Sequence, residues 1–140
     1  MLHVGIRVRP FLPNEKDKTQ TSVLSINSKN HSLEIMEKGV KNDLTPVINQ
    51  KKFYFQHLYD EKATTSHIFM DLYYPMLQQS LTNNNNVCLF NFGYTGSGKT
   101  YTMLNDGGII TNLYDWLKKS NREISLSSYE IYQNQVYDLL

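Results

Sequence analysis

The chain is 140 residues long, which fits one domain or a part of one. Its composition, 40% hydrophobic and 19% charged, is typical of a globular protein, and it holds neither an apolar run of membrane-spanning length nor the apolar core of a signal peptide. The formal net charge of +1 gives no basic field for a nucleic acid, so we expect neither a membrane nor a nucleic acid as a partner.

The first predicted element is a strand over residues 2–9, where apolar and polar residues alternate. Pro10 follows and ends the strand, because proline cannot donate to a sheet ladder. From spacing alone, Arg7 and Arg9 are more simply explained as the solvated face of this strand than as ligand-binding groups.

The next segment predicts a small hairpin. Residues 23–26 and 32–36 are short runs of strand-forming residues separated by a polar turn. Residues 38–52 are polar and predict a loop, and residues 53–55 predict a short aromatic strand.

A helix is predicted after this strand, capped by the hydroxyl-bearing run Thr64–Ser66. Apolar residues recur on one helical face from Ile68 to Leu81, which is typical of packing against a core. Pro75 lies within this helix and should kink or loosen it. The run Asn83–Asn86 then predicts a loop, because asparagine is turn-prone and tolerates a left-handed backbone.

Residues 87–90, Val-Cys-Leu-Phe, predict a short buried strand. Cys88 is the only cysteine, so it cannot form a disulfide within the chain, and we expect it to be a small buried core residue. This cysteine usage favours an intracellular, reducing compartment. The four histidines show no metal-ligand spacing, and no arrangement of residues indicates a catalytic triad.

The most informative stretch is the sequence GYTGSGKT, which follows this predicted strand. It fits the phosphate-loop pattern of glycine, four residues, glycine, lysine and threonine, in the required setting of strand, loop and helix. A glycine-rich turn that matches by chance is the alternative, but four specified positions seldom match by accident. The residues that we expect to hold phosphate are Gly93, Tyr94, Thr95, Gly96, Ser97, Gly98, Lys99 and Thr100.

The chemistry of a nucleoside triphosphate explains this spacing. Gly93, Gly96 and Gly98 let the backbone curl so that successive N–H groups point inward as an anion-binding nest. The following helix adds free N–H groups and the positive end of its dipole. Lys99 would reach the β- and γ-phosphates, and the Thr100 hydroxyl would hold Mg²⁺.

The remaining residues predict a turn at Asp106–Gly108 and a second amphipathic helix from Ile109 to Lys119. A strand is predicted from Ile124 to Tyr132, and residues 136–140 begin a further apolar element. Strands that alternate with helices around a phosphate loop indicate an α/β fold of the phosphate-loop NTPase type. This fold is a three-layer sandwich whose central layer is a mixed, mostly parallel sheet, which we expect to be incomplete on its C-terminal side.

Five motifs stand in order along the chain. They are RVRP at residues 7–10, FYFQ at 53–56, the phosphate loop with its extension YTM at 93–103, GII at 108–110, and the serine, EIY and DLL elements at 127–140. Together they resemble the N-terminal part of a kinesin motor domain. The resemblance is specific and covers nearly the whole chain, because an unrelated phosphate-loop enzyme would not be expected to carry the other four motifs.

This resemblance implies ATP and Mg²⁺ as cofactors, and a catalytic role for Lys99. It also implies that Arg7, Arg9 and Pro10 lie against one side of the adenine and that Tyr101 faces the other side. Flat guanidinium, proline and aromatic groups are physically suited to sandwich a base.

The resemblance further implies a microtubule motor in the cytoplasm, on the cytoskeleton. The family's switch segments, N-x-x-S-S-R-S-H and D-L-A-G-x-E, do not occur in these residues. We therefore expect residues 1–140 to be the N-terminal part of a motor domain that binds tubulin by means of segments outside this chain. A coiled coil outside this chain could join two copies as a homodimer.

Two alternatives stay open. The first is a kinesin-like protein that binds nucleotide without productive hydrolysis, because several residues differ from the family pattern: Gln56, Tyr94, Thr111, Asn112 and Ser128. The second is another phosphate-loop enzyme, such as a small-molecule kinase, which would need an acceptor site that the sequence does not indicate.

Overall fold

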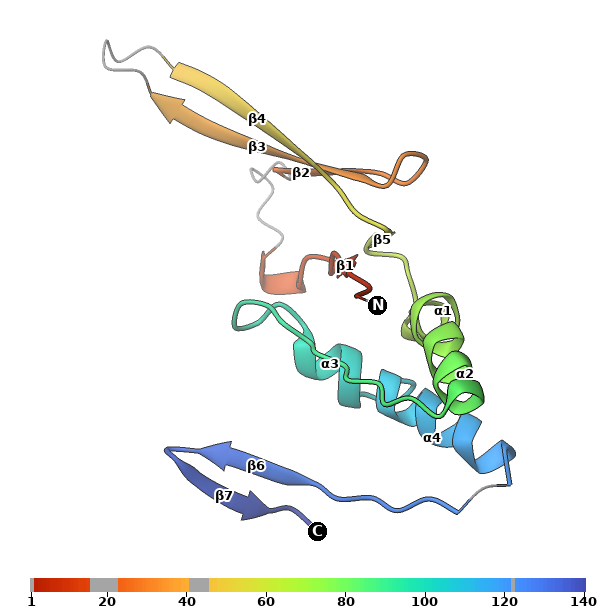
Figure 1. The fold of residues 1–140 in the computed structure, drawn as a ribbon. Coiled ribbons are helices and arrows are strands. Elements are labelled where there is room, and N and C mark those ends of the chain that lie inside the picture. Colours follow the sequence, from red (N-terminus) through yellow and green to blue (C-terminus); the bar gives the residue numbers. More distant parts are fainter. Residues whose placement is uncertain (1, 16–22, 41–45, 122) are drawn as a thin grey trace.

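The structure is a computed structural model that describes residues 2–15, 23–40, 46–121 and 123–140. Figure 1 shows the helices in the middle of the molecule, with a three-stranded sheet at one end and a two-stranded hairpin at the other. The third sheet, which is a pair of parallel strands, lies between the three-stranded sheet and the helices. Parallel and antiparallel pairing are therefore both present, as predicted, although within the described residues only one of the three sheets is parallel.

Strand β1 (Gly5–Arg7) pairs in parallel with β5 (His57–Tyr59), and Gly5 lies opposite His57. The backbone N–H of Val8 adds a bond of 2.9 Å to the carbonyl of Tyr59. The strand is shorter than the predicted range of residues 2–9, because its partner β5 offers only three residues to the ladder. Pro10 lies beyond its end, as expected.

The three-stranded sheet consists of β2 (Leu24–Asn27), β3 (Ser32–Val40) and β4 (Pro46–Tyr54) in antiparallel order. The predicted hairpin is confirmed, but the prediction of a loop over residues 38–52 is wrong within its described part. The predicted aromatic strand at 53–55 is the end of the much longer β4.

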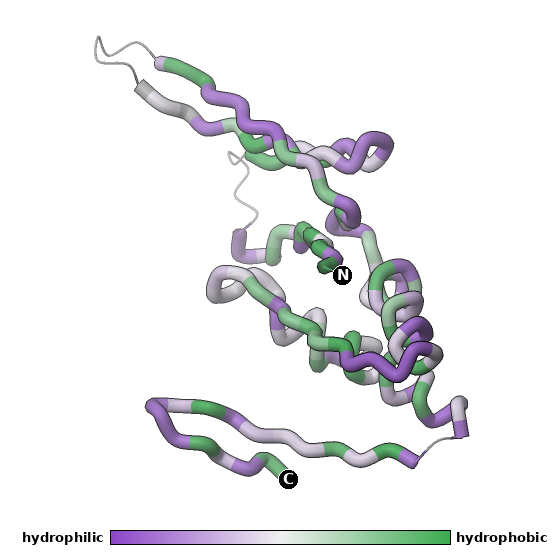
Figure 2. Tube along the Cα trace, in the orientation of Figure 1, coloured by the Kyte–Doolittle hydropathy of each residue, from purple (hydrophilic) through white to green (hydrophobic). Residues whose placement is uncertain are grey.

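Cross-strand charge explains why this region forms strands although its sequence is polar. Lys52 lies opposite Glu34 with an N–O distance of 2.7 Å, and Lys51 contacts Glu37 at 2.9 Å. Figure 2 shows a hydrophilic stretch along β4, the strand whose sequence contains these lysines together with Asn49 and Gln50. Such ion pairs stabilise a sheet whose two faces are largely exposed. A strand of this kind has few apolar residues, so a search for alternating apolar and polar residues does not detect it.

The central helical segment consists of α1 (Thr65–Ile68), a π-helical turn (Phe69–Tyr73) and α2 (Tyr74–Asn83). Thr64 caps it, because its side chain accepts a bond of 3.1 Å from the N–H of His67. The widened turn immediately precedes Pro75, so the proline loosens the helix as predicted. Asn84 ends it with a left-handed φ of 52°.

Helices α3 (Lys99–Leu104) and α4 (Ile109–Lys119) follow the phosphate loop, at the positions predicted for helices. Ile109, at the start of α4, is fully buried. The aromatic rings of Tyr74 and Trp116 meet edge to face at 5.8 Å, which joins α2 to α4. The buried core contains Tyr59, Ile68, Phe69, Leu72 and Ile109.

The segment before the phosphate loop differs from its prediction. Within the described residues, 87–90 are extended but pair with no strand, so the predicted buried strand is not formed. Phe90 is 87% exposed and Phe92 is 99% exposed. Cys88 is also exposed, so its assignment to the core is wrong. The apolar run has the right composition for a strand, but composition does not supply the neighbours that would cover it.

The last two strands, β6 (Tyr129–Tyr132) and β7 (Gln135–Asp138), form an exposed hairpin. The predicted strand from Ile124 therefore begins later, at Tyr129. Gln133 and Asn134 have φ values of 48° and 62°, which gives the tight turn whose twist suits a hairpin. Within residues 2–15, 23–40, 46–121 and 123–140, no helix has both the length and the apolar composition needed to cross a bilayer.

Candidate functional site

The predicted phosphate loop forms a compact turn between the extended segment and α3. Gly96 and Gly98 have φ values of 79° and 93°, in the left-handed region that favours glycine. The N–H of Ser97 donates to the carbonyl of Tyr94 at 3.0 Å and closes the turn. Glycine therefore suits the backbone conformation at both positions, of which the motif specifies Gly98 and leaves Gly96 open.

Gly93 is required for a different reason, which is space. A Cβ atom placed there would lie 2.4 Å from Ser97 Oγ and 3.3 Å from Ser97 Cβ. Any larger residue would therefore require the Ser97 side chain to rotate or shift. The first glycine of the motif thus lets the two ends of the loop approach each other.

Lys99, the first residue of α3, folds back over the loop. Its Nζ donates to the carbonyls of Gly93 at 2.9 Å and Tyr94 at 3.0 Å. Thr100 follows in the first turn of the helix and is exposed. The motif's charged group therefore lies against the loop backbone, and its hydroxyl-bearing residue is exposed in the first turn of the following helix.

Asn91 is a loop-supporting residue that the sequence analysis missed. Its Nδ2 donates to the carbonyl of Lys99 at 2.9 Å, which links the segment before the loop to the helix after it. The sequence carried no signal for this role, because an asparagine within an apolar run is equally explained as an exposed strand residue.

Arg7 connects three parts of the site through its guanidinium group. Nη1 donates to Thr65 Oγ1 at 3.0 Å and to Thr102 Oγ1 at 3.1 Å, and Nη2 donates to the carbonyl of Ala63 at 3.2 Å. The group also lies over the Tyr101 ring, 5.6 Å from its centre. Arg7 thus holds β1, the start of α1 and α3 together, a role that its prediction as an adenine contact did not include.

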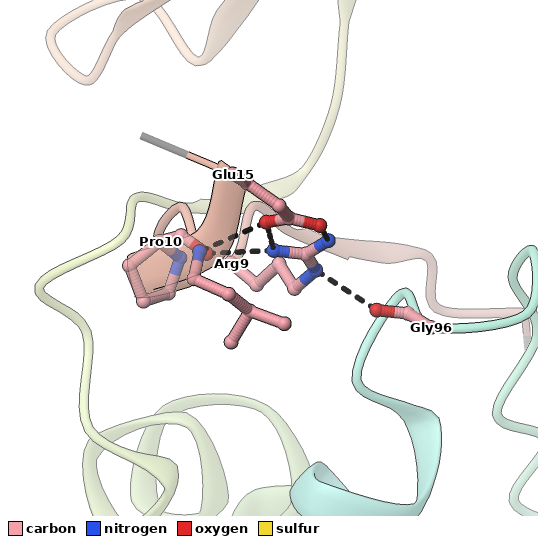
Figure 3. Close-up of polar contacts among 5 residues, drawn as sticks. Arg9, Pro10, Glu15 and Gly96 are labelled. Carbon is pink, nitrogen blue, oxygen red and sulfur yellow. Dashed lines mark hydrogen bonds and ion pairs between the residues drawn. The ribbon is translucent and has the colours of Figure 1, made fainter. Parts of the chain in front are cut away.

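Arg9 reaches the phosphate loop itself (Figure 3). Its Nε donates to the carbonyl of Gly96 at 2.9 Å, and its two terminal nitrogens donate to the two carboxylate oxygens of Glu15, each at 2.6 Å. Glu15 ends a short 3-10 turn (Pro13–Glu15) and also accepts from the N–H of Leu12 at 2.8 Å. The solvated-face interpretation of Arg9 is therefore incomplete, because the side chain joins two segments.

The contact between Arg9 and Glu15 shifts the pKa of both groups. The hydrogen bonds from Arg9, followed by the bond from the Leu12 N–H, lower the pKa of Glu15 to about 2. The same hydrogen bonds, which Arg9 donates to Glu15, raise the pKa of Arg9. Both groups therefore remain charged at neutral pH. Glu15 was not predicted as a site residue, since an acidic residue in a polar loop has no distinctive sequence signal.

The structure brings some of the predicted site residues together and leaves others apart. Arg9 packs beside the loop, with its Cδ 3.8 Å from a Cβ placed on Gly98, and its Nη1 donates to the carbonyl of Pro10 at 2.9 Å. Tyr94 is 89% exposed and Thr95 is also exposed, so the middle of the loop faces outward. Arg7 and Tyr101 form a second group next to it.

Comparison with protein families identifies this arrangement. The kinesin motor domain matches residues 7–140, which include the phosphate loop and both arginines. The chain belongs to the kinesin motor domain family. The resemblance to this family that the five sequence motifs suggested is therefore confirmed.

Individual kinesins agree with this assignment. The chain is 32% identical to the human kinesin-like protein KIF24 over 99% of its own length, and it spans 11% of that protein. It is also 32% identical to the kinesin-like protein KAR3 of Saccharomyces cerevisiae, over 99% of its length and 20% of that protein.

A solved kinesin motor domain has the same fold. The motor domain of the Kar3-like kinesin from Ashbya gossypii superposes with a TM-score of 0.64 and 34% identity, over 96% of this chain and 44% of the other. This likeness confirms the predicted α/β fold of the phosphate-loop NTPase type. The chain covers less than half of that motor domain and a smaller share of the longer relatives.

Proposed function

We propose that this chain is the ATP-binding part of a microtubule-based motor. The observation that supports the proposal most directly is the phosphate loop, in which two left-handed glycines shape the backbone and Lys99 lies against it. Membership of the kinesin motor domain family supports ATP as the nucleotide and the microtubule as the filament.

The residues fit an ATP molecule with Mg²⁺. The loop N–H groups between Gly93 and Gly98 suit the phosphates, and Lys99 is near enough to exchange its two carbonyl partners for phosphate oxygens. The exposed hydroxyl of Thr100 suits a hard cation, which when bound neutralises charge on the phosphates. Tyr101 is 59% exposed and offers a ring to the adenine.

Hydrolysis needs groups beyond this cradle, namely an acidic residue near the metal and a residue that positions the attacking water. We propose that these groups, the tubulin-binding elements and any coiled coil for a homodimer belong to parts of the motor domain outside the 140 residues. The product would then act in the cytoplasm, on the cytoskeleton. The 44% coverage of a solved motor domain supports this division.

The test uses the full natural product that contains these residues. We expect it to bind a fluorescent ATP analogue with magnesium, and its ATPase rate to rise when polymerised microtubules are added. Nucleotide binding should compete with unlabelled ATP. A product that binds no ATP contradicts the proposal.

A second candidate is a kinesin-like nucleotide-binding protein without productive hydrolysis. Tyr94 favours it, because this large residue stands in the phosphate loop and is 89% exposed. The same experiment separates the two candidates. ATP binding with no microtubule-stimulated turnover supports the second, and stimulated turnover excludes it.

A further inference from the structure

The contact between Arg9 and Gly96 joins the N-terminal segment to the phosphate loop. Arg9 follows β1, and Gly96 is in the middle of the loop. Figure 3 shows the guanidinium between Glu15 on one side and the Gly96 carbonyl on the other. The planar guanidinium group of Arg9 therefore donates hydrogen bonds to both Glu15 and Gly96.

This contact fixes the orientation of one peptide group. A trans peptide directs its C=O and its following N–H to opposite sides. Because the Gly96 carbonyl is directed at Arg9, the N–H of Ser97 is turned the other way, toward the carbonyl of Tyr94 within the loop. That bond closes the turn, so the contact from Arg9 restrains the shape of the loop backbone, whose N–H groups form the proposed anion-binding nest.

Gly96 makes such a constraint necessary. A Cβ built at this residue would meet nothing within 4 Å, and its φ of 79° lies in a region that glycine enters and leaves readily. Side-chain packing therefore does not hold this peptide plane. The hydrogen bond from Arg9 Nε supplies an external restraint.

Glu15 in turn fixes the guanidinium. A bidentate carboxylate defines the plane and direction of an arginine fork, so Nε is aimed at Gly96. The two side chains are 31% and 34% exposed, so solvent screens their attraction. The main effect of the pair is therefore on geometry.

We propose that Glu15 is a positioning residue for the phosphate loop, which acts through Arg9 on the Gly96–Ser97 peptide and thereby sets the affinity of the loop for the triphosphate. This inference rests on the proposed function for its consequence in ligand affinity. The orientation of the loop peptide is a property that can be measured without a ligand.

The test compares Glu15→Gln with Glu37→Gln in the full natural product. Glutamine keeps the size of Glu15 and can still accept from the Leu12 N–H, but it lacks the charged fork. Glu37 is the matched control, because it forms an exposed ion pair with Lys51 in the three-stranded sheet. Affinities for ATP and for inorganic tripolyphosphate are measured, together with hydrogen exchange of the amides of residues 94–98.

We expect Glu15→Gln to weaken ATP and tripolyphosphate by the same factor, roughly three- to tenfold, and to speed exchange of the loop amides. Glu37→Gln should change none of these. Glu15→Asp, which keeps the charge, should restore part of the affinity. Arg9→Lys should behave like Glu15→Gln, because lysine has no Nε donor or fork.

Other outcomes overturn the inference. If only ATP is weakened, Glu15 acts on the side of the base and the loop is not its target. If neither ligand is weakened in a protein that binds ATP, Glu15 has no positioning role. If the unmodified protein binds no ATP, the proposed function fails. Hydrogen exchange of the loop amides then tests the inference by itself, and an unchanged exchange rate in Glu15→Gln contradicts it.

Discussion

The guanidinium carbon of Arg7 lies 5.6 Å from the centre of the Tyr101 ring, so a residue of the first strand covers the residue that follows the phosphate loop. The same guanidinium donates to Thr102, whose hydroxyl donates in turn to the carbonyl of Gly98 at 2.9 Å. The end of the loop is therefore connected to β1 through one arginine and one threonine.

Replacing Arg7 should destabilise the fold as well as the site. Arg7→Lys loses the fork that serves Ala63, Thr65 and Thr102 at once, and we expect a loss of about 1–3 kcal/mol in the free energy of unfolding. Chemical denaturation of the full natural product measures it. Lys118→Gln, a change at an exposed position of α4, is the control and should stay within about 0.5 kcal/mol. Equal midpoints for the two variants contradict the prediction.

Lys99→Ala tests the cradle directly. We expect ATP affinity to fall at least tenfold, a change of about 1.4 kcal/mol, because the ammonium group next to the loop is lost. The variant should remain folded, since the Lys99 side chain donates to exposed or half-buried loop carbonyls and its backbone bond to Asn91 is kept in alanine. Equilibrium titration with a fluorescent ATP analogue gives the affinity, and circular dichroism gives the folding control. Undiminished binding in a folded variant would remove Lys99 from the site.

Two neighbouring glycines should resist substitution for different reasons. Gly107 has a φ of 73° with open space around its Cβ position, so Gly107→Ala should cost about 1–2 kcal/mol for backbone strain alone. A Cβ on Gly108 would lie 2.6 Å from the Met103 carbonyl oxygen and 2.7 Å from that of Asn105, so Gly108→Ala should cost about 1–3 kcal/mol through overpacking.

Asparagine distinguishes these two causes. It enters the left-handed region more easily than alanine does, so Gly107→Asn should be milder than Gly107→Ala. At Gly108 the larger side chain meets the same backbone atoms, so Gly108→Asn should be no better than Gly108→Ala. Thermal unfolding of the four variants checks the pattern, and rescue by asparagine at Gly108 would be inconsistent with the steric cause.

The Arg9–Glu15 pair should give stability a defined dependence on pH. The pKa of Glu15 is lowered to about 2 in the fold, whereas an unfolded glutamate titrates near about 4.3. The contribution of its charge is therefore complete above about pH 5 and is lost as the pH falls toward about 2. The difference in melting temperature between the natural protein and Glu15→Gln should shrink over that interval. A difference that is constant from pH 7 to pH 3 argues against the pair.

The phosphate loop and its neighbours could be predicted because their signals are local. The glycines at 96 and 98, the cap at Thr64 and the loosening before Pro75 each follow from the conformational preferences of one residue. The start of α3 at Lys99 follows from the motif in the same way.

Features that depend on distant partners could not be predicted. The strand character of β4 comes from pairs such as Lys52 with Glu34, which are invisible until the strands are aligned. The extended run at 87–90 was expected to be buried, but no described strand covers it. Glu15 belongs to the site only because a short turn places it against Arg9.

The parallel pairing of β1 with β5 favours one order of events during folding. Gly5 and His57 face each other although β2, β3 and β4 all lie between them in the chain. Closing so long a segment is entropically costly, whereas the antiparallel pairs inside it are closed by nearer residues. If the small sheet forms first, it shortens the effective length that β1 and β5 must still close. The three-stranded sheet would then speed assembly of the site, although neither the phosphate loop nor Arg9 nor Glu15 belongs to it.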